Sequence, residues 1–294
     1  MIKSYTPLNL NGTDQRPITL ITGACGGMGK ACSRLFGQYR RLFLCDVNSE
    51  RLNAFGDELC AEGYTVVAAV SLDIGDNRAV AELVSLLPGP GQVVNLIHTA
   101  GLSPTLAGWD AIMRTNYAGT CYLLDAMAPM LHKDFVAVCI ASVAGHMVPA
   151  SSALDRALDG VASPDFDAGI AAVLRELTPD GDDFQLAGTS YNTSKYGVIR
   201  HCERLASAWL RKGARLVTIS PGIIATPMGR KEVTSNPQAD SLAAVAPEIP
   251  QATAMDIARV AEFLCSPQAR FITGTDLRVD GGIVARVRQL AAGA

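Results

Sequence analysis

The sequence predicts an α/β protein whose core is a doubly wound parallel sheet of about seven strands in a single domain. First, short apolar runs rich in β-branched residues alternate with longer helix-like segments between residues 17 and 142. Second, these runs are continuously apolar, which is typical of parallel strands covered by helices on both faces. Third, 294 residues with 49% hydrophobic and 18% charged content suit one large globular domain and exclude disordered and collagen-like classes.

The expected elements can be placed in chain order. Each strand-helix-strand unit should cross over with right-handed sense. Residues 1–16 are polar and lack the apolar core of a secretory signal, so they predict a flexible leader. Residues 17–285 form the expected domain, and residues 286–294 the expected tail. Strands are expected at residues 18–21, 42–45, 65–70, 93–97, 135–140, 215–220 and 276–279.

Charge and cysteine usage narrow the class of partner. A net charge of −3 gives no broad electrostatic reason to bind nucleic acid or an anionic membrane, and no apolar run reaches the roughly 18 residues that span a bilayer. The eight cysteines include no CxxC pair, so we expect small buried hydrophobes in a reducing cytoplasm rather than disulfides or a metal site. A soluble, cytoplasmic protein with a small-molecule substrate is predicted.

Two stretches interrupt the alternation of strands and helices. Residues 150–188 carry eight acidic side chains against two basic ones, which indicates an acidic surface insertion. Within it, the spacing of Ile170, Val173, Leu174 and Leu177 predicts one amphipathic helix whose apolar side must be covered. Residues 226–250 contain four prolines among small and polar residues, a composition suited to a mobile lid with short helices.

A glycine-rich turn follows the first strand of the domain. Residues 22–29 read Thr-Gly-Ala-Cys-Gly-Gly-Met-Gly and lead into a helical run from Lys30. Glycines at such a turn let the backbone approach a pyrophosphate, which the helix N-terminus favours. A tight strand-to-helix turn also needs glycine without any ligand, so the motif alone is weak. Its position in the first strand-helix-strand unit favours a dinucleotide.

Asp46 ends the second strand of the domain, where a carboxylate can accept hydrogen bonds from an adenosine ribose. An acid there would repel a 2'-phosphate, so Asp46 favours NAD over NADP. The alternative for Asp46 is a helix N-cap or turn residue. Arg40 and Arg41 precede the strand and are either phosphate ligands or, as we favour, solvated turn residues.

Tyr191 and Lys195 lie four residues apart at the expected start of a helix, so both side chains project from one face. An ammonium beside a phenol lowers the tyrosine pKa and gives a group able to exchange a proton with an alcohol or carbonyl. Ser142 ends the fifth strand, at the edge where open α/β sheets bind ligands. Each feature alone is common, and Ser142 alone would be a cap or turn serine.

Taken in order along the chain, these motifs resemble the short-chain dehydrogenases/reductases over about residues 17–285. The resemblance implies that Tyr191 is the general acid/base, that Lys195 lowers its pKa and binds the nicotinamide ribose, and that hydride passes directly between nicotinamide and substrate. It implies that Ser142 orients the substrate oxygen and that Asn116 holds a water linking Lys195 to solvent. The implied cofactor contacts are Gly23, Gly27, Met28 and Gly29 at the pyrophosphate, Asp46 at the ribose, Asp73 and Ile74 at the adenine, Thr226 near the carboxamide, and Ala100, Gly101, Tyr191, Lys195, Pro221 and Gly222; Asp280-Gly281-Gly282 completes the motif series.

The chain departs from the family pattern at two places. His98 stands where the family usually has Asn, either contacting the cofactor or, as we favour, stabilising the strand end. The enlarged segment between Ser142 and Tyr191 is similar to that of the bacterial 3α-hydroxysteroid dehydrogenase/carbonyl reductase subgroup. This similarity implies a ketone or secondary alcohol on a bulky apolar skeleton, a steroid being one candidate. The insertion should border the active-site mouth and shape the substrate cleft, the assembly interface, or both.

Three functions are compared on this basis. An NAD-dependent alcohol dehydrogenase or carbonyl reductase retains all four of Asn116, Ser142, Tyr191 and Lys195, as this chain does. A non-catalytic NAD(H) sensor or scaffold would keep the fold and lack turnover. An epimerase or dehydratase of the longer related families fits the glycine spacing and the short C-terminal portion less well. The family resemblance implies a homodimer or homotetramer.

Overall fold

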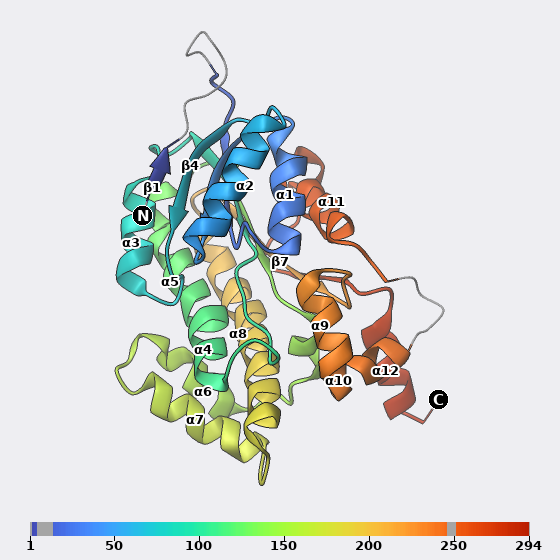
Figure 1. Ribbon diagram of the computed structural model, residues 1–294. Coiled ribbons are helices and arrows are strands. Elements are labelled where there is room, and N and C mark those ends of the chain that lie inside the picture. The colour runs from blue at the N-terminus through green and yellow to red at the C-terminus, as the bar shows by residue number, and fades with distance from the viewer. Residues whose placement is uncertain (1, 5–13, 246–250, 294) are drawn as a thin grey trace.

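The computed structural model describes residues 2–4, 14–245 and 251–293 and shows one sheet sandwiched between two layers of helices (Figure 1). The strand order is β1-β4-β3-β2-β5-β6-β7-β8, and β2 to β8 all run parallel. The predicted doubly wound sheet of about seven parallel strands is therefore confirmed. The parallel strands are β2 (Ile18–Thr22), β3 (Arg41–Asp46), β4 (Val66–Ser71), β5 (Val93–His98), β6 (Val136–Ile140), β7 (Arg215–Pro221) and β8 (Asp276–Val279).

Helices cover both faces of the sheet, which explains why the strands are mostly apolar. All residues of β2, β6 and β7 are buried. One face carries α1 (Gly27–Gly37), α2 (Ser49–Ala61) and α11 (Ala254–Cys265). The other carries α3 (Asn77–Ser85), α4 (Trp109–Ile112), a π-helical stretch over Met113–Ala118, α5 (Gly119–Ala126) and α8 (Asp183–Leu210).

Both chain ends differ from the expected leader and tail. Strand β1 (Ile2–Ser4) pairs antiparallel with β4, because β4 would otherwise present an unpaired edge. The rest of the predicted leader lies largely at residues 5–13, outside the described residues. The predicted tail from residue 286 instead belongs to α12 (Ile283–Ala291). Asp280 stabilises the first turn of this helix by accepting from the Val284 N–H at 2.9 Å.

The insertion folds as two helices rather than one. α6 (Ser152–Asp159) precedes α7 (Phe166–Leu177), and α7 buries Phe166, Ile170 and Leu174, so the predicted amphipathic helix is confirmed. A capping box of Asp182 and Gln185 then starts α8 inside the insertion. Helix α8 therefore begins two turns before Tyr191 and not at Tyr191 as expected.

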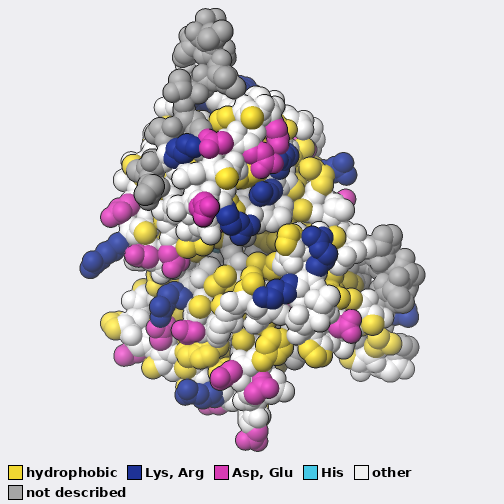
Figure 2. All heavy atoms as spheres, viewed as in Figure 1, with side chains coloured by type: hydrophobic (Ala, Val, Ile, Leu, Met, Phe, Trp, Pro, Cys, Tyr) yellow, Lys and Arg dark blue, Asp and Glu magenta, His cyan; other side chains and the backbone are white. Residues whose placement is uncertain are grey.

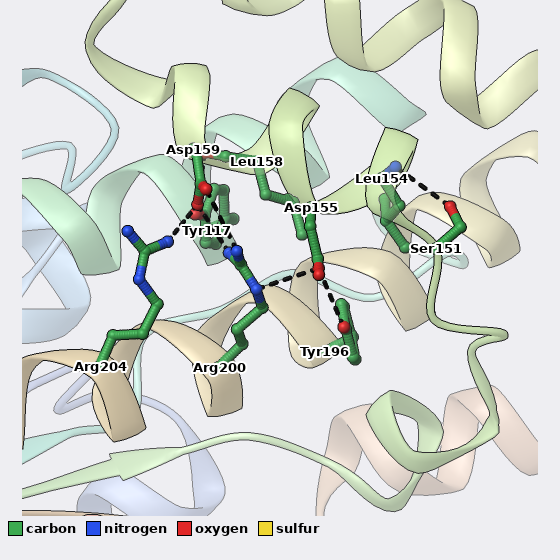
Figure 3. A network of polar contacts seen from close by, with 9 residues as sticks. All are labelled: Tyr117, Ser151, Leu154, Asp155, Leu158, Asp159, Tyr196, Arg200 and Arg204. Carbon is green, nitrogen blue, oxygen red and sulfur yellow. Dashed lines mark hydrogen bonds and ion pairs between the residues drawn. The ribbon is translucent and has the colours of Figure 1, made fainter.

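Two acidic residues of α6 form ion pairs with α8 (Figure 3). Asp155 and Asp159 both pair with Arg200, at 3.0 and 2.7 Å, and Asp159 also pairs with Arg204. The Tyr196 hydroxyl donates to Asp155 at 3.0 Å. The Tyr117 hydroxyl donates to the Leu158 carbonyl at 3.0 Å. The insertion therefore docks on the turns of α8 that follow Lys195.

Asp159→Asn is expected to destabilise the protein by about 1 kcal/mol, a small value because the carboxylate is 39% exposed. The Arg200 hydrogen bond lowers the pKa of Asp159 to about 2 from 3.8, so this stability is present above pH 3.8 and is lost as the pH falls toward 2. Thermal unfolding at pH 7 and at decreasing pH measures it. The control is Asp167→Asn, whose pair with Arg114 is 61% and 52% exposed and should contribute nothing measurable. Equal effects of both substitutions would contradict the assignment.

The segment predicted as a lid contains the expected short helices, α9 (Pro227–Ser235) and α10 (Pro237–Ala244). Its last residues, 246–250, lie outside the described residues. In the part of the chain that the structure describes, no helix has both the length and the apolarity to cross a bilayer.

Candidate active site

The candidate residues gather where the parallel strands end, and Figure 2 shows a hollow on this face between the ends of α1 and α2 and helix α9, bordered by hydrophobic and basic side chains. The glycine-rich turn leaves β2 and enters α1. Gly23 has φ of +67°, and a Cβ there would lie 2.6 Å from the Ala100 nitrogen. A Cβ on Gly29 would overlap the Gly23 carbonyl oxygen. Only glycine fits these two positions, so the turn presents bare backbone.

This turn fits the pyrophosphate of a dinucleotide. Among the described residues no side chain caps α1, and its first turn carries no acidic residue, so the positive end of the helix is available to an anion. Met28 packs partly buried behind the turn. Thr226, which caps α9, lies so close to Gly27 that a Cβ there would be 2.5 Å from its methyl group. Helix α9 thus begins next to the glycine-rich turn.

Asp46 is bound to the glycine-rich turn rather than capping a helix. Its Oδ2 accepts from the Cys25 N–H at 2.9 Å and its Oδ1 from the Asn48 N–H at 3.2 Å. The N-cap of α2 is Asn48, so the cap alternative for Asp46 fails. Arg51, which sequence reasoning missed, donates to the Cys25 carbonyl at 3.1 Å. The backbone N–H of Cys25 is therefore bound by Asp46 at the end of β3, and its carbonyl by Arg51 of α2.

The two arginines considered for a phosphate lie away from Asp46. Arg41 begins β3 whereas Asp46 ends it, and the Arg41 Nε donates to the Arg16 carbonyl at 2.6 Å. Arg40 stacks on Tyr39, with its guanidinium carbon 5.0 Å from the ring centroid.

The other expected cofactor residues line neighbouring strand ends. Asp73 accepts from the Gly75 N–H at 2.8 Å and shapes the turn after β4, while Ile74 packs against Gly119. Ala100 abuts Gly23, and Pro221 ends β7. Gly222 approaches Asp280 closely, and Gly101 lies beside both Asn116 and Lys195.

Ser142, Tyr191 and Lys195 come together beside the glycine-rich turn. Ser142 ends the extension of β6 and caps the following 3₁₀ turn, accepting from the Ala144 N–H at 3.2 Å. Hydrogen bonding from Ser142 acts to lower the pKa of Tyr191. The Lys195 Nζ is buried, donates to the Ile140 carbonyl at 2.9 Å, and lies 5.8 Å from the centroid of the Tyr191 ring.

The electrostatics of this cluster differ from the expectation. Burial raises the pKa of Tyr191, and the charge of Glu232 raises it further, while the Ser142 hydrogen bond acts in the opposite direction. Burial lowers the pKa of Lys195 from 10.5 to about 8. The expected lowering of the tyrosine pKa by Lys195 is not found in this structure, in which burial has the largest effect on Tyr191.

Asn116 lies in the π-helical stretch, a local distortion that is frequent at functional sites. Its amide oxygen accepts from the Leu102 N–H at 2.7 Å, and its amide nitrogen donates to the Leu102 carbonyl at 2.9 Å and to Ser194 at 3.2 Å. The side chain thereby clamps the loop after β5. The water-holding role that the resemblance implies remains a proposal.

His98 joins three buried elements, as the structural alternative predicted. Thr120 donates its hydroxyl proton to the Asn116 carbonyl at 2.6 Å, so His98 Nε2 must donate to the Thr120 oxygen at 2.8 Å. His98 Nδ1 then accepts from Thr22 at 2.7 Å. Burial lowers the pKa of His98 to about 3, and the nearby Lys195 charge adds to this. A neutral histidine here fixes Thr22 and the Asn116 backbone.

Comparisons with known proteins agree with this geometry. Residues 17–154 match the family model "short chain dehydrogenase", and residues 184–284 match the model "Enoyl-(Acyl carrier protein) reductase". A 3-alpha-hydroxysteroid dehydrogenase/carbonyl reductase of Comamonas testosteroni is 30% identical over 244 residues, covering 78% of this chain and 90% of that protein. A short-chain dehydrogenase/reductase of Alternaria brassicicola, bsc3, is 28% identical, covering 91% and 96%.

A solved structure matches the fold. The 3-alpha-hydroxysteroid dehydrogenase from Pseudomonas sp. B-0831, complexed with NADH, superposes with a TM-score of 0.72 at 23% identity, covering 92% of this chain and 98% of that chain.

Proposed function

The chain belongs to the short-chain dehydrogenase/reductase family, and from this premise we propose that it is an NAD-dependent oxidoreductase interconverting a secondary alcohol and a ketone. The family binds NAD or NADP and acts on CH–OH donors. The observation that carries the proposal is the placement of Ser142, Tyr191 and Lys195 beside a turn where side chains are sterically excluded. A sensor or scaffold would not require that cluster.

Each residue of the cluster has a proposed part in the reaction. Tyr191 transfers the proton to or from the substrate oxygen, and Ser142 orients that oxygen. Lys195 supplies a positive charge that favours the tyrosinate once substrate and cofactor are bound. Asn116 holds the loop after β5 and a water beside Lys195. A bound nicotinamide cofactor would supply the hydride acceptor or donor.

The expected cofactor contacts stand as proposals at the positions described above. The turn formed by Gly23, Gly27 and Gly29, with Met28 behind it, would hold the pyrophosphate. Asp46 would meet the adenosine ribose. The adenine and nicotinamide would be contacted by Asp73, Ile74, Ala100, Gly101, Tyr191, Lys195, Pro221, Gly222 and Thr226.

We propose a bulky apolar ketone or alcohol, such as a steroid, as substrate. Support comes from the similarity to the Comamonas enzyme, whose name gives hydroxysteroid and carbonyl substrates. The net charge of −3 agrees with an uncharged small-molecule partner. A homodimer or homotetramer in the cytoplasm is proposed on family grounds.

The test is NADH and NADPH oxidation against steroid ketones, quinones and simple aliphatic ketones. We expect NADH-dependent reduction with a preference for the bulky apolar skeletons. NADH binding without turnover of any compound in the panel would favour the sensor. Product formation without net change in NADH would indicate an epimerase.

Asp46→Asn is expected to improve NADPH binding relative to NADH by about tenfold, because it removes the charge that repels a 2'-phosphate and keeps an acceptor for Cys25. Asp46→Ala removes that acceptor as well and should weaken both cofactors, since the glycine-rich turn loses a tie. Fluorescence titration with NADH and NADPH compares the variants. Equal affinity of the parent for both cofactors would refute the argument for NAD.

A further inference from the structure

The lid helix α9 is joined to the loop after β5 by a cluster of contacts around Thr105. Glu232 Oε1 accepts from the Thr105 N–H at 3.0 Å and from the Thr105 hydroxyl at 2.5 Å. Lys231 Nζ donates to the Thr105 carbonyl at 2.8 Å. All polar groups of Thr105 are therefore engaged by two consecutive residues of α9, although the segments lie 127 positions apart in the chain.

Glu232 is held in place as a charged group. Its Oε2 accepts from the Asn236 amide at 3.0 Å, so both carboxylate oxygens are bound. Burial alone would raise the pKa of Glu232, but hydrogen bonds from Ser103, Thr105 and Asn236 bring it below its usual range. A half-buried carboxylate kept ionised by several donors makes strong, directional hydrogen bonds.

The two joined segments frame the candidate active site. The loop is fixed at its start by Asn116, which clamps Leu102, and near its end by Glu232. Helix α9 starts at Thr226, over Gly27, and the Glu232 charge is close enough to affect Tyr191. Releasing Thr105 would leave α9 without this tie to the strand ends.

We propose that Glu232 is a positioning residue that latches α9 to Thr105 and so keeps the lid over the substrate side of Tyr191. The proposal depends on the proposed function only for its kinetic readout. When the latch opens, water can replace the hydrogen bonds between Thr105 and α9. Helix α9 can then move away from Thr105 while the sheet stays folded. Arg230 and Lys231 are exposed on α9 and provide trypsin sites that report opening.

Limited trypsin digestion of the full chain without substrate tests the latch. Glu232→Ala should raise the rate of cleavage after Arg230 and Lys231 about tenfold, as expected for losing hydrogen bonds to a charged group. Thr105→Val keeps the N–H donor and should raise the cleavage rate severalfold. Glu232→Gln keeps an acceptor oxygen and should restore most of the protection. Thr234→Ala is the matched control, because its hydroxyl bonds only to the α9 carbonyls of Arg230 and Lys231.

Steady-state kinetics give the second readout. Glu232→Ala and Thr105→Val should both raise KM for the ketone about tenfold. The kcat of Thr105→Val should stay within about twofold, because this variant keeps the Glu232 charge near Tyr191 and does not touch the reacting atoms. Unchanged cleavage and KM in both variants would overturn the proposal. If Glu232→Ala fails to fold, Thr105→Val carries both measurements. If the parent reduces no ketone, the proposed function fails, and digestion still decides on the latch.

Discussion

Tyr191→Phe is expected to lower kcat for ketone reduction by about 10²- to 10⁴-fold and to leave NADH affinity within about twofold. The substitution removes the hydroxyl that would transfer the proton and keeps the ring that fills the same space. Stopped-flow or steady-state NADH oxidation measures the first effect, and fluorescence titration of NADH the second. The raised pKa of Tyr191 keeps the phenol protonated in the protein without ligand, which suits proton donation in the reductive direction.

Tyr196→Phe is the matched control for this experiment. Tyr196 lies on the same helix, but its hydroxyl donates to Asp155 of the insertion at 3.0 Å (Figure 3). Loss of the Tyr196 hydroxyl should leave kcat unchanged and destabilise the protein only slightly. Substantial activity in Tyr191→Phe, or equal losses in both variants, would rule out Tyr191 as the general acid/base.

The parts of the molecule that sequence predicts are those set by local pattern. The sequence pattern identified all seven parallel strands, because burial on both faces leaves few polar positions in β2 to β7. The edge strand β8 carries Asp276 and Arg278. The glycine-rich turn was predictable because the backbone next to the strand leaves no room for a side chain at Gly23 or Gly29. Ser142 could be placed at the ligand-binding edge because the carboxyl ends of parallel strands share it. Its meeting with Tyr191, which lies on α8, was implied only by the family resemblance.

What could not be predicted depends on contacts between distant segments. Nothing local to Glu232 indicates that it binds Thr105, and the charge it places near Tyr191 follows from that fold. Lys195 was expected to lower the tyrosine pKa from its spacing alone, yet the choice of Ile140 as its partner is decided by the end of β6. Arg51 carried a usable signal, since a basic residue one turn into the helix after Asp46 can reach the glycine-rich turn.

Lys195→Met is expected to abolish activity and to stabilise the protein. Burial lowers the pKa of Lys195 from 10.5 to about 8, so keeping the ammonium in the folded protein at neutral pH costs about 3 kcal/mol. Methionine keeps much of the apolar stem and removes that cost. Losing the bond to Ile140 leaves a carbonyl unpaired at about 1–3 kcal/mol, so the net gain should be about 1 kcal/mol. Activity should fall by about 10²-fold or more, because the charge near the phenol is gone.

The pH dependence of unfolding shows whether Lys195→Met stabilises the protein by removing a buried charge or only by packing better. Between pH 8 and 10.5 the unfolded chain keeps the lysine proton that the folded protein has released, so the unfolded state binds more protons. Stability of the parent relative to Lys195→Met should therefore rise as the pH increases from 8, and urea unfolding at pH 7 and pH 9.5 measures the change. Lys212→Met, at an exposed position just after α8, should show no such trend. A variant less stable than the parent at pH 7 would mean that the bond to Ile140 outweighs desolvation, and the lysine would then serve the fold as much as the reaction.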